Sequence, residues 1–165
     1  MSHFKLVHDQ NCGPEKFWEV FFDEPYNRAL YKYVGTKERQ FLELHDHGAT
    51  KTWQLRVFPE RDLPEWVKKV VRGDLGYIEH AVMDKAKHRI VSRIEPTLFK
   101  DKTKINVVYS IEEIAPGKVR RTFEGDVEVS IPILGRKVES LIISDMEKAY
   151  QSIADFTNDW LVQHA

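Results

Sequence analysis

Residues 134–160 read LGRKVESLIISDMEKAYQSIADFTNDW, and their apolar residues recur at steps of three and four. That spacing is typical of an α-helix with one apolar stripe. The stripe consists of Leu134, Val138, Leu141, Ile142, Met146, Ala149, Ile153, Phe156 and Trp160. At about 1.5 Å per residue, a helix of roughly thirty residues is about 40 Å long, enough to cross a whole sheet. We therefore expect one long helix that packs along one face against the rest of the chain.

The region before this helix alternates between polar and apolar residues, which is typical of β-strands. Turn residues divide it into hairpins, with strands predicted at 36–46, 50–58, 77–83, 88–99, 105–114 and 118–131. A first strand is predicted at 4–9, followed by two short helices at 14–22 and 26–33. The expected fold class is α+β, a helix-grip fold in which a seven-stranded antiparallel sheet wraps around the long C-terminal helix.

The last predicted strand has one face that is expected to be covered by the rest of the protein and one face that is exposed to solvent. The covered face is expected to carry Val119, Arg121, Phe123, Gly125, Val127, Val129 and Ile131. Polar residues alternate with these and form the other face.

Composition narrows the class of protein. The 165 residues fit one domain, 1–165, and the 42% of hydrophobic residues, with 9 Phe, 6 Tyr and 4 Trp, can form a core. The net charge of −1 argues against a nucleic-acid partner. The single cysteine, Cys12, excludes an internal disulfide and favours a reducing compartment. Because neither a signal peptide nor an apolar run of about 20 residues is recognisable, a cytoplasmic location is expected.

Two stretches resemble a known superfamily. One is LPEWVKKVVRGDL at 63–75, which leads into Glu79. The other is VSIPILGRKVE at 129–139, followed by a helix that ends in FTNDWL at 156–161. With these stretches and its element order, the chain resembles the START-like superfamily (also called SRPBCC), which includes Bet v 1-like proteins, polyketide cyclases and lipid-transport proteins. Within it, the chain looks most like a bacterial family of unknown function, although Arg136 stands where that family usually has a second glycine. The resemblance implies a single START-like domain with a ligand cavity.

The segment 62–74 is predicted to form a short amphipathic helix between two strands. Asp62 and Glu65 have the spacing of a capping box, Trp66 belongs to the apolar face, and Lys68 lies among the cations of the other face. Such a helix could pack on the sheet edge, serve as a lid over the cavity, or make transient contact with an anionic membrane. The resemblance favours the lid.

Arg121 is the most unusual residue of the covered strand face. A buried guanidinium needs a partner, because an isolated buried charge is costly. It could pair with an internal acid, sit at an open end of the sheet, or hold a carboxylate or phosphate of a ligand. Asp145 borders the helix stripe, where it could meet Arg121, a ligand hydroxyl or water.

Other candidate sites are weaker. His45 and His47 point the same way on a strand, but two histidines without further ligands do not make a metal site. Cys12 precedes a helix start, yet no base is recognisable beside it. The sequence contains no phosphate-binding glycine loop, no GxSxG and no HExxH, so neither a catalytic motif, a metal nor a cofactor is predicted.

The leading hypothesis is a carrier or sensor of a hydrophobic, lipid-like small molecule, with Arg121 anchoring an anionic head. The predicted ligand-binding residues are Trp53, Trp66, Tyr77, Tyr109, Arg121, Phe123, Val127, Val138, Leu141, Ile142, Asp145, Met146 and Ala149. The competing hypothesis is a cyclase or dehydratase acting on a polyketide-like or aromatic substrate. Its proton-transfer candidates are Tyr77, Tyr109, Glu79 and Asp145. A third possibility is a module that binds a protein partner through the wet face of the sheet.

Overall fold

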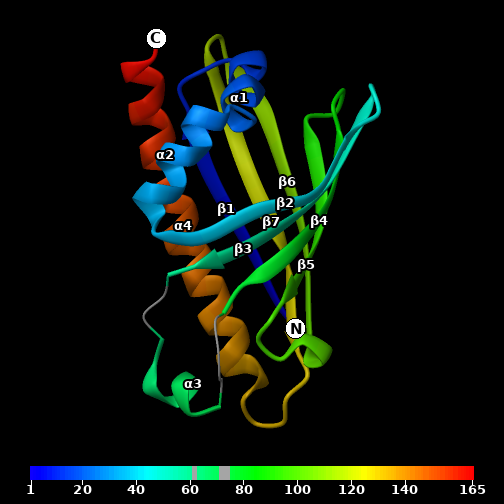
Figure 1. Cartoon of the computed structure of the whole chain (residues 1–165). Helices are drawn as coiled ribbons and strands as arrows, with labels where there is room; N and C mark the ends of the chain where they lie inside the picture. Colours follow the sequence, from blue (N-terminus) through cyan, green and yellow to red (C-terminus); the bar gives the residue numbers. More distant parts are fainter. Residues whose placement is uncertain (61–62, 71–74) are drawn as a thin grey trace.

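The computed structural model of the chain describes residues 1–60, 63–70 and 75–165. Figure 1 shows the strands, the long C-terminal helix and the short helices. In chain order they are β1 (Ser2–Gln10), α1 (Pro14–Phe21), α2 (Glu24–Val34), β2 (Thr36–Asp46), β3 (Thr50–Pro59), α3 (Glu65–Val70), β4 (Tyr77–Asp84), β5 (Arg89–Pro96), the 3-10 turn η1 (Lys100–Lys102), β6 (Thr103–Ala115), β7 (Lys118–Val129) and α4 (Gly135–Gln163).

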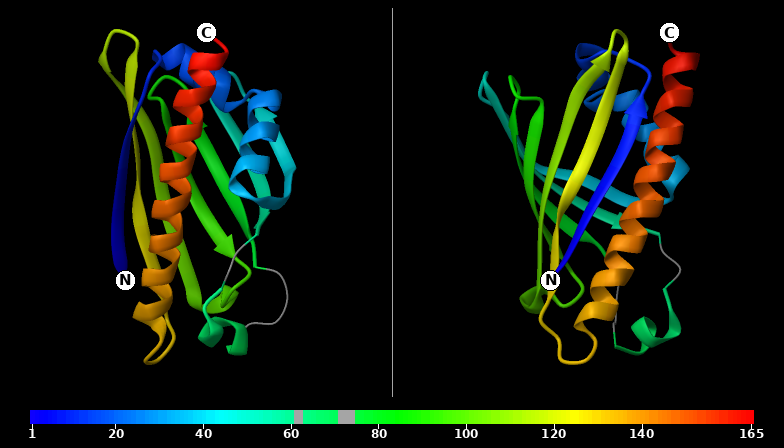
Figure 2. Two further views of the ribbon diagram at one scale, coloured as in Figure 1. Left: turned by 90° about the vertical axis from the view of Figure 1, so that its left-hand side faces the viewer. Right: turned by 180° about the vertical axis from the view of Figure 1, so that it is seen from behind.

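The strands form one antiparallel sheet in the order β1-β7-β6-β5-β4-β3-β2. From β2 to β7, each strand pairs with the next strand along the chain. β1 pairs with β7, so β1 and β2 are the two edge strands of the sheet. The views in Figure 2 show that the sheet is strongly curved and that α4 runs along its hollow side. α4 packs against β1, β7 and α2, so the opposite part of the sheet, β2 to β5, stands away from the helix.

The predicted faces of β7 are confirmed. Val119, Arg121, Phe123, Val127 and Val129 are buried, whereas the residues between them are partly or fully exposed. The seven-stranded antiparallel sheet and the long C-terminal helix are confirmed as well, and they define a helix-grip architecture.

Two predicted strand ends are wrong. The strand predicted at 88–99 ends at Pro96, because Phe99 takes a left-handed backbone conformation (φ 50°) and the chain turns through η1. The last strand ends at Val129 rather than at residue 131, just before Pro132.

The predicted helix at 62–74 is described only in part. α3 covers Glu65–Val70, while Asp62 of the predicted capping box and residues 71–74 lie outside the described residues. α3 lies beside the N-terminal end of α4, where the Lys137 ammonium sits 4.6 Å from the centre of the Trp66 ring. In the part of the chain that the structure describes, no helix is long and apolar enough to cross a membrane.

Candidate functional site

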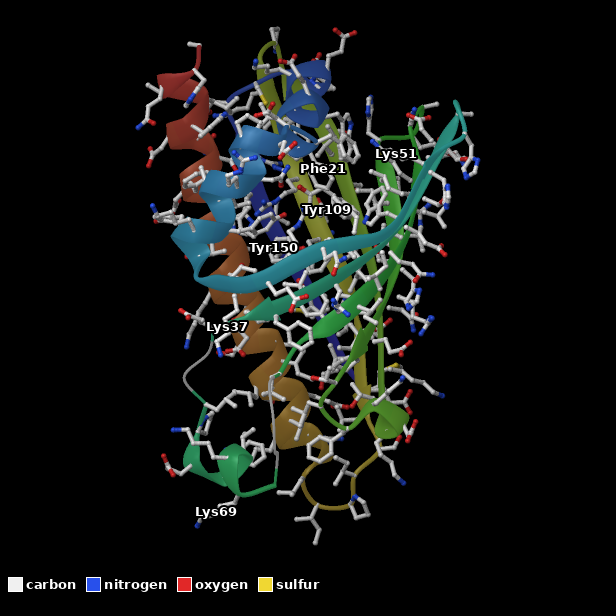
Figure 3. The ribbon with its side chains drawn as sticks, viewed as in Figure 1. Phe21, Lys37, Lys51, Lys69, Tyr109 and Tyr150 are labelled. Carbon is white, nitrogen blue, oxygen red and sulfur yellow. The ribbon has the colours of Figure 1, made fainter. Side chains whose placement is uncertain are left out.

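A cavity of about 800 Å³ lies between the sheet and the helices. Its wall is built from α1, α2, the second half of α4 and inward-facing residues of β2 to β7. Figure 3 shows Phe21, Tyr109 and Tyr150 gathered in this space, whereas Lys69 of α3 lies at the far end of the molecule. The cavity exists because α4 follows β1 and β7 and stands away from β2 to β5, while, among the strands, α1 packs mainly on β6 and β7 and α2 mainly on β2.

The cavity wall is rich in aromatic side chains. Twelve of its side chains are Phe, Tyr or Trp, contributed by α1, α2, five strands and α4. Tyr150 of α4 stacks on Phe123 of β7, with ring centroids 4.2 Å apart and planes nearly parallel. Tyr109 lies beside both rings, at centroid distances of 6.5 Å and 6.2 Å. These three rings form the floor of the cavity, in which Tyr109 is tilted by 59° against Phe123 and by 54° against Tyr150.

Arg121 lines this floor and is only 2% exposed. Its Nη2 donates to the carbonyl oxygen of Tyr150 and interacts with Nδ1 of His8, both at 2.9 Å. Its Nε is buried and has no hydrogen-bond partner. Among the residues that the structure describes, no carboxylate forms an ion pair with Arg121. The internal-acid alternative therefore has no support in the described part of the chain.

His8 fixes the guanidinium from the side of β1. Arg121 can donate to Nδ1 only when that nitrogen carries no proton, so the contact selects a neutral His8 ring. Burial, followed by the charge of Arg121, lowers the pKa of His8, although Gln151, Asp155 and Asp9 act in the opposite direction. The positive charge at this position therefore lies on the guanidinium of Arg121, while the His8 ring is neutral.

A second polar cluster lies on β3, β4 and β5. Glu79 accepts a hydrogen bond of 2.8 Å from the buried Ser92 hydroxyl, and the Trp53 indole N–H lies 3.5 Å from its other oxygen. Burial raises the pKa of the Glu79 carboxyl, and these two hydrogen bonds and Arg39 oppose the rise only in part. A carboxyl of this kind can carry a proton into an apolar cavity.

Arg39 enters the cavity from the edge strand β2. Its guanidinium lies 4.4 Å from the Tyr31 ring and 4.7 Å from the Phe41 ring, and its buried Nε has no hydrogen-bond partner. Tyr31 in turn donates to Asn27 within α2. This arrangement joins α2 to β2 through stacking.

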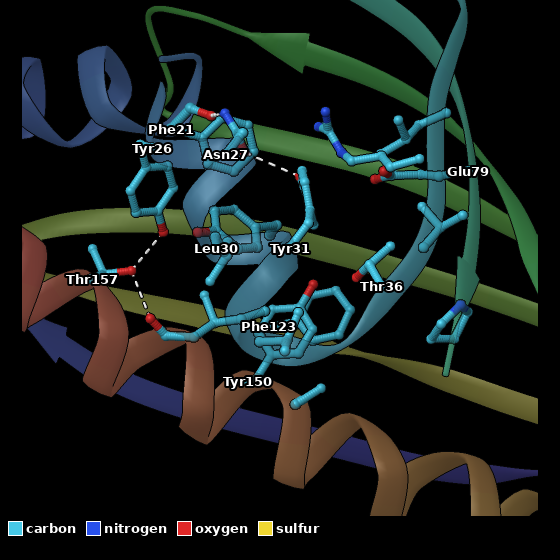
Figure 4. Close-up of a pocket in the computed structure, with 18 of the residues that line it drawn as sticks. Phe21, Tyr26, Asn27, Leu30, Tyr31, Thr36, Glu79, Phe123, Tyr150 and Thr157 are labelled. Carbon is cyan, nitrogen blue, oxygen red and sulfur yellow. Dashed lines mark hydrogen bonds between the residues drawn. The ribbon is translucent and has the colours of Figure 1, made fainter. Parts of the chain in front are cut away.

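The phenols around the cavity are held in their neutral form. Burial raises the pKa of Tyr31, Tyr109 and Tyr150 above the ordinary value of 10.0. Tyr26 shares a short hydrogen bond of 2.7 Å with Thr157 of α4, which ties α2 to the long helix (Figure 4). These tyrosines offer hydroxyl donors and acceptors without charge.

Seven of the residues predicted to bind ligand line the cavity: Trp53, Tyr77, Tyr109, Arg121, Phe123, Asp145 and Ala149. The other six lie elsewhere. Val127 and Val138 are fully buried in the core, Ile142 and Met146 pack against that core, and Leu141 is half-buried. Trp66 packs beside Lys137, and no described residue of α3 lines the cavity, so lid and membrane roles of 62–74 stay predictions.

The apolar stripe of α4 meets two different surfaces along its length, the cavity and the strand β7. The α4 residues that line the cavity fall between Asp145 and Thr157. Val138 lies two turns earlier, where the neighbouring Glu139 accepts a hydrogen bond from the backbone N–H of Val129 at the end of β7. Helical periodicity identifies the inward side of a helix but not which turns meet a cavity and which meet a strand.

Several cavity residues were not anticipated from the sequence. They are mostly on α1, α2 and β2, and include Phe21, Tyr26, Tyr31, Arg39 and Tyr150. The density of aromatic residues between 17 and 33 is the signal that could have indicated them. Their contacts in the cavity are with residues far away in the sequence, and no local sequence pattern indicates such contacts.

The weaker candidates lie outside the cavity wall. Cys12 is buried, and burial raises the pKa of its thiol, which disfavours the nucleophilic thiolate. His45 and His47 are exposed near the β2–β3 turn, with ring centroids 6.1 Å apart. Across the described ranges, no three His, Cys, Asp or Glu side chains gather as a metal site would require.

Three solved structures are similar to this chain over nearly its whole length. A START superfamily protein from Mycobacterium smegmatis has a TM-score of 0.64 at 17% identity, over 99% of each chain. The aromatase/cyclase ZhuI from a Streptomyces species has a TM-score of 0.64 at 11% identity, over 96% of this chain and 92% of that one. Norcoclaurine synthase from Thalictrum flavum, solved with dopamine and hydroxybenzaldehyde, has a TM-score of 0.68 at 11% identity, over 99% and 88%.

These similarities, together with the helix-grip architecture, define a protein with the START-like, or Bet v 1-like, fold. At the sequence level, residues 5–161 match the family described as "Protein of unknown function (DUF2505)", and the chain belongs to that family. No curated protein matches the sequence.

Proposed function

We propose that the protein binds a hydrophobic small molecule in this cavity, as a carrier or sensor. The observation that carries the proposal is the cavity itself: about 800 Å³, walled mainly by aromatic and aliphatic side chains, with a few fixed polar groups. Ligand sites for small molecules have this size and composition, on the order of 300–1,000 Å³. The START-like fold of the structural neighbours supports the proposal, since one of them was solved with two aromatic molecules bound.

The direct test is native mass spectrometry of protein purified gently from its own host, followed by organic extraction. We expect a stoichiometric extra mass that leaves with the organic phase. If the protein stays empty and also fails to take up any hydrophobic probe, it does not act as a carrier.

Filling the cavity provides a second test. Ala149 of α4 lines the cavity but is itself exposed, so it lies at the cavity rim, and an Ala149→Trp variant places a large ring at that rim. We expect affinity for phenylnaphthylamine, a neutral fluorescent probe, to fall at least about tenfold, because the ring occupies ligand volume. The control is Glu147→Trp, an exposed position on the same helix that is not among the cavity residues. Equal binding by the Ala149 variant and the control would contradict the assigned cavity.

A second candidate function rests on Glu79. Its carboxyl has a raised pKa and lies in the cavity with Tyr77, Tyr109 and Asp145, so it is suited to general acid or base chemistry on a polyketide-like or aromatic substrate. The similarity to an aromatase/cyclase favours the same candidate. Turnover of an aromatic polyketide precursor that disappears in Glu79→Gln or Tyr109→Phe, with probe binding kept, would establish an enzyme. Absence of turnover together with ligand retention would favour the carrier.

A further inference from the structure

We propose that the ligand is an aromatic oxyanion whose acidic group sits on Arg121. This inference rests on the proposed function and specifies the chemical class of the molecule bound. It covers carboxylates, sulfonates and phosphates alike, since all of them present oxygens that a guanidinium binds.

The first argument is the missing counter-charge. Arg121 is 2% exposed and lines the cavity, yet it forms no ion pair within the described ranges. Its partners are a neutral imidazole, a peptide carbonyl and the faces of Tyr150 and Tyr109, at 5.1 Å and 6.0 Å from Cζ. A buried charge without a counter-charge is costly, so a bound anion would lower the cost of burying Arg121.

The second argument is the free donor. Both hydrogen bonds of Arg121 use Nη2, and they fix the plane of the guanidinium. The buried Nε–H is left without an acceptor. Nε itself is enclosed, so an incoming oxyanion would meet the guanidinium at Nη1, which donates in neither hydrogen bond and is not among the fully buried atoms.

The third argument is the balance of charge around the cavity. The wall carries the cations Arg39, Lys51, Arg121 and Lys148 and the acids Glu60, Glu79 and Asp145. Glu79 sits on β4, away from Arg121 on β7, and forms its hydrogen bonds with β3 and β5 instead. The cavity therefore favours a negatively charged guest.

The ring content of the wall indicates that this guest is aromatic. The stacked pair Phe123 and Tyr150 lies directly beside Arg121, whose Cζ is 5.1 Å from the Tyr150 ring. Because Phe123 and Tyr150 cover one face of each other, a flat ring system next to the acid would meet the edges of this pair and the tilted Tyr109 ring. Such edge-to-face contacts are available to an aromatic guest, whereas an acyl chain would gain only unspecific apolar contact.

The test uses two probes with the same aromatic skeleton, anilinonaphthalene sulfonate, which is anionic, and phenylnaphthylamine, which is neutral. In Arg121→Met we expect the anionic probe to lose at least about tenfold in affinity and the neutral probe to stay within about twofold. Arg121→Lys should retain part of the anionic affinity. Arg120→Met is the matched control, since Arg120 is the next residue of β7, faces outward and pairs with Asp9.

The outcomes separate the two proposals. If the folded Arg121→Met variant loses both probes equally or neither of them, the anion site is wrong while a hydrophobic cavity can stand. If the wild-type protein binds neither probe, the proposed function itself fails.

A wild-type measurement covers the case in which Arg121→Met does not fold. The carboxyl of isotope-labelled naphthoate can be titrated by NMR while it is bound. We expect its pKa to be lower than in free naphthoate, because the guanidinium favours the anion. A raised pKa would mean burial of the acid away from the cation and would overturn the inference. Naphthoate should also displace phenylnaphthylamine at concentrations at least about fivefold lower than decanoate; a preference for decanoate would contradict the aromatic class.

Discussion

Glu79 and Arg121 show how the same cavity treats two ionisable residues differently. Glu79 has hydrogen-bond donors from Ser92 and Trp53 but no ion pair among the described residues, so burial dominates and raises its pKa. A guanidinium cannot respond in this way, because it stays protonated in proteins. The cavity therefore holds a carboxyl that can be neutral and a cation that cannot.

The raised pKa of Glu79 has a measurable consequence for stability. Above the ordinary value of 4.5 the folded protein holds a proton on Glu79 that the unfolded chain releases. The free energy of unfolding therefore loses a contribution as pH rises from 4.5 through the folded-state pKa. Glu79→Gln mimics the neutral acid, so its free energy of unfolding should fall less than that of the wild type between about pH 5 and about pH 8.

Urea denaturation at both pH values measures this difference. Glu43→Gln is the control, because Glu43 is an exposed acid on β2. If Glu79→Gln and Glu43→Gln respond to pH alike, Glu79 is ionised in the folded protein at neutral pH, and its role as a proton carrier is excluded.

At the scale of elements, the packing of β7 on β6 depends on Gly125. A Cβ at this position would overlap the carbonyl oxygen of Asn106 and would lie 2.9 Å from Cα of Val107, so the two strand backbones approach closely here. Gly125→Ala must push the strands apart, and we expect it to cost about 2 kcal/mol or more in the free energy of unfolding.

Gly13→Ser serves as the comparison for Gly125→Ala. Gly13 precedes α1, and the atom nearest to an added Cβ is 4.0 Å away, while serine is a preferred residue before a helix. Its effect should stay below about 1 kcal/mol in chemical denaturation. A small effect of Gly125→Ala would show that the strands can separate without loss.

The elements were predictable from the sequence to a much greater extent than the site. Alternation along β7 and the spacing of the α4 stripe are local signals, and both were confirmed except at Ala149 of the stripe, which is exposed. The polar contacts of the cavity are not local: Arg121 and His8 are 113 residues apart, and Tyr26 and Thr157 are 131 apart. No periodicity indicates that α2 docks across the hollow of the sheet, so the share of α1, α2 and β2 in the cavity could not be derived.

At the scale of the whole molecule, one part of the fold provides most of the core packing and another part provides the ligand cavity. The first part of α4 packs on β1 and β7 through fully buried residues such as Val138 and Val127. The cavity lies further along the molecule, between α2, the second half of α4 and the inward faces of β2 to β7. Changes in the cavity wall can therefore alter the ligand while the β1, β7 and α4 packing keeps the protein folded.

That division predicts the thermal response to ligand. A compound that binds the folded protein alone, at about 100 times its Kd, stabilises it by about 2.7 kcal/mol. For a chain of 165 residues, this corresponds to a rise of roughly 5–10 °C in Tm. We expect naphthoate to produce this rise in differential scanning calorimetry, and the rise should scale with the logarithm of its concentration. Ala149→Trp should unfold near the wild-type Tm without ligand and lose most of the rise. An equal rise in that variant would place naphthoate outside the cavity. Binding at any site of the folded protein raises its Tm, so a rise that survives a filled cavity must come from another site.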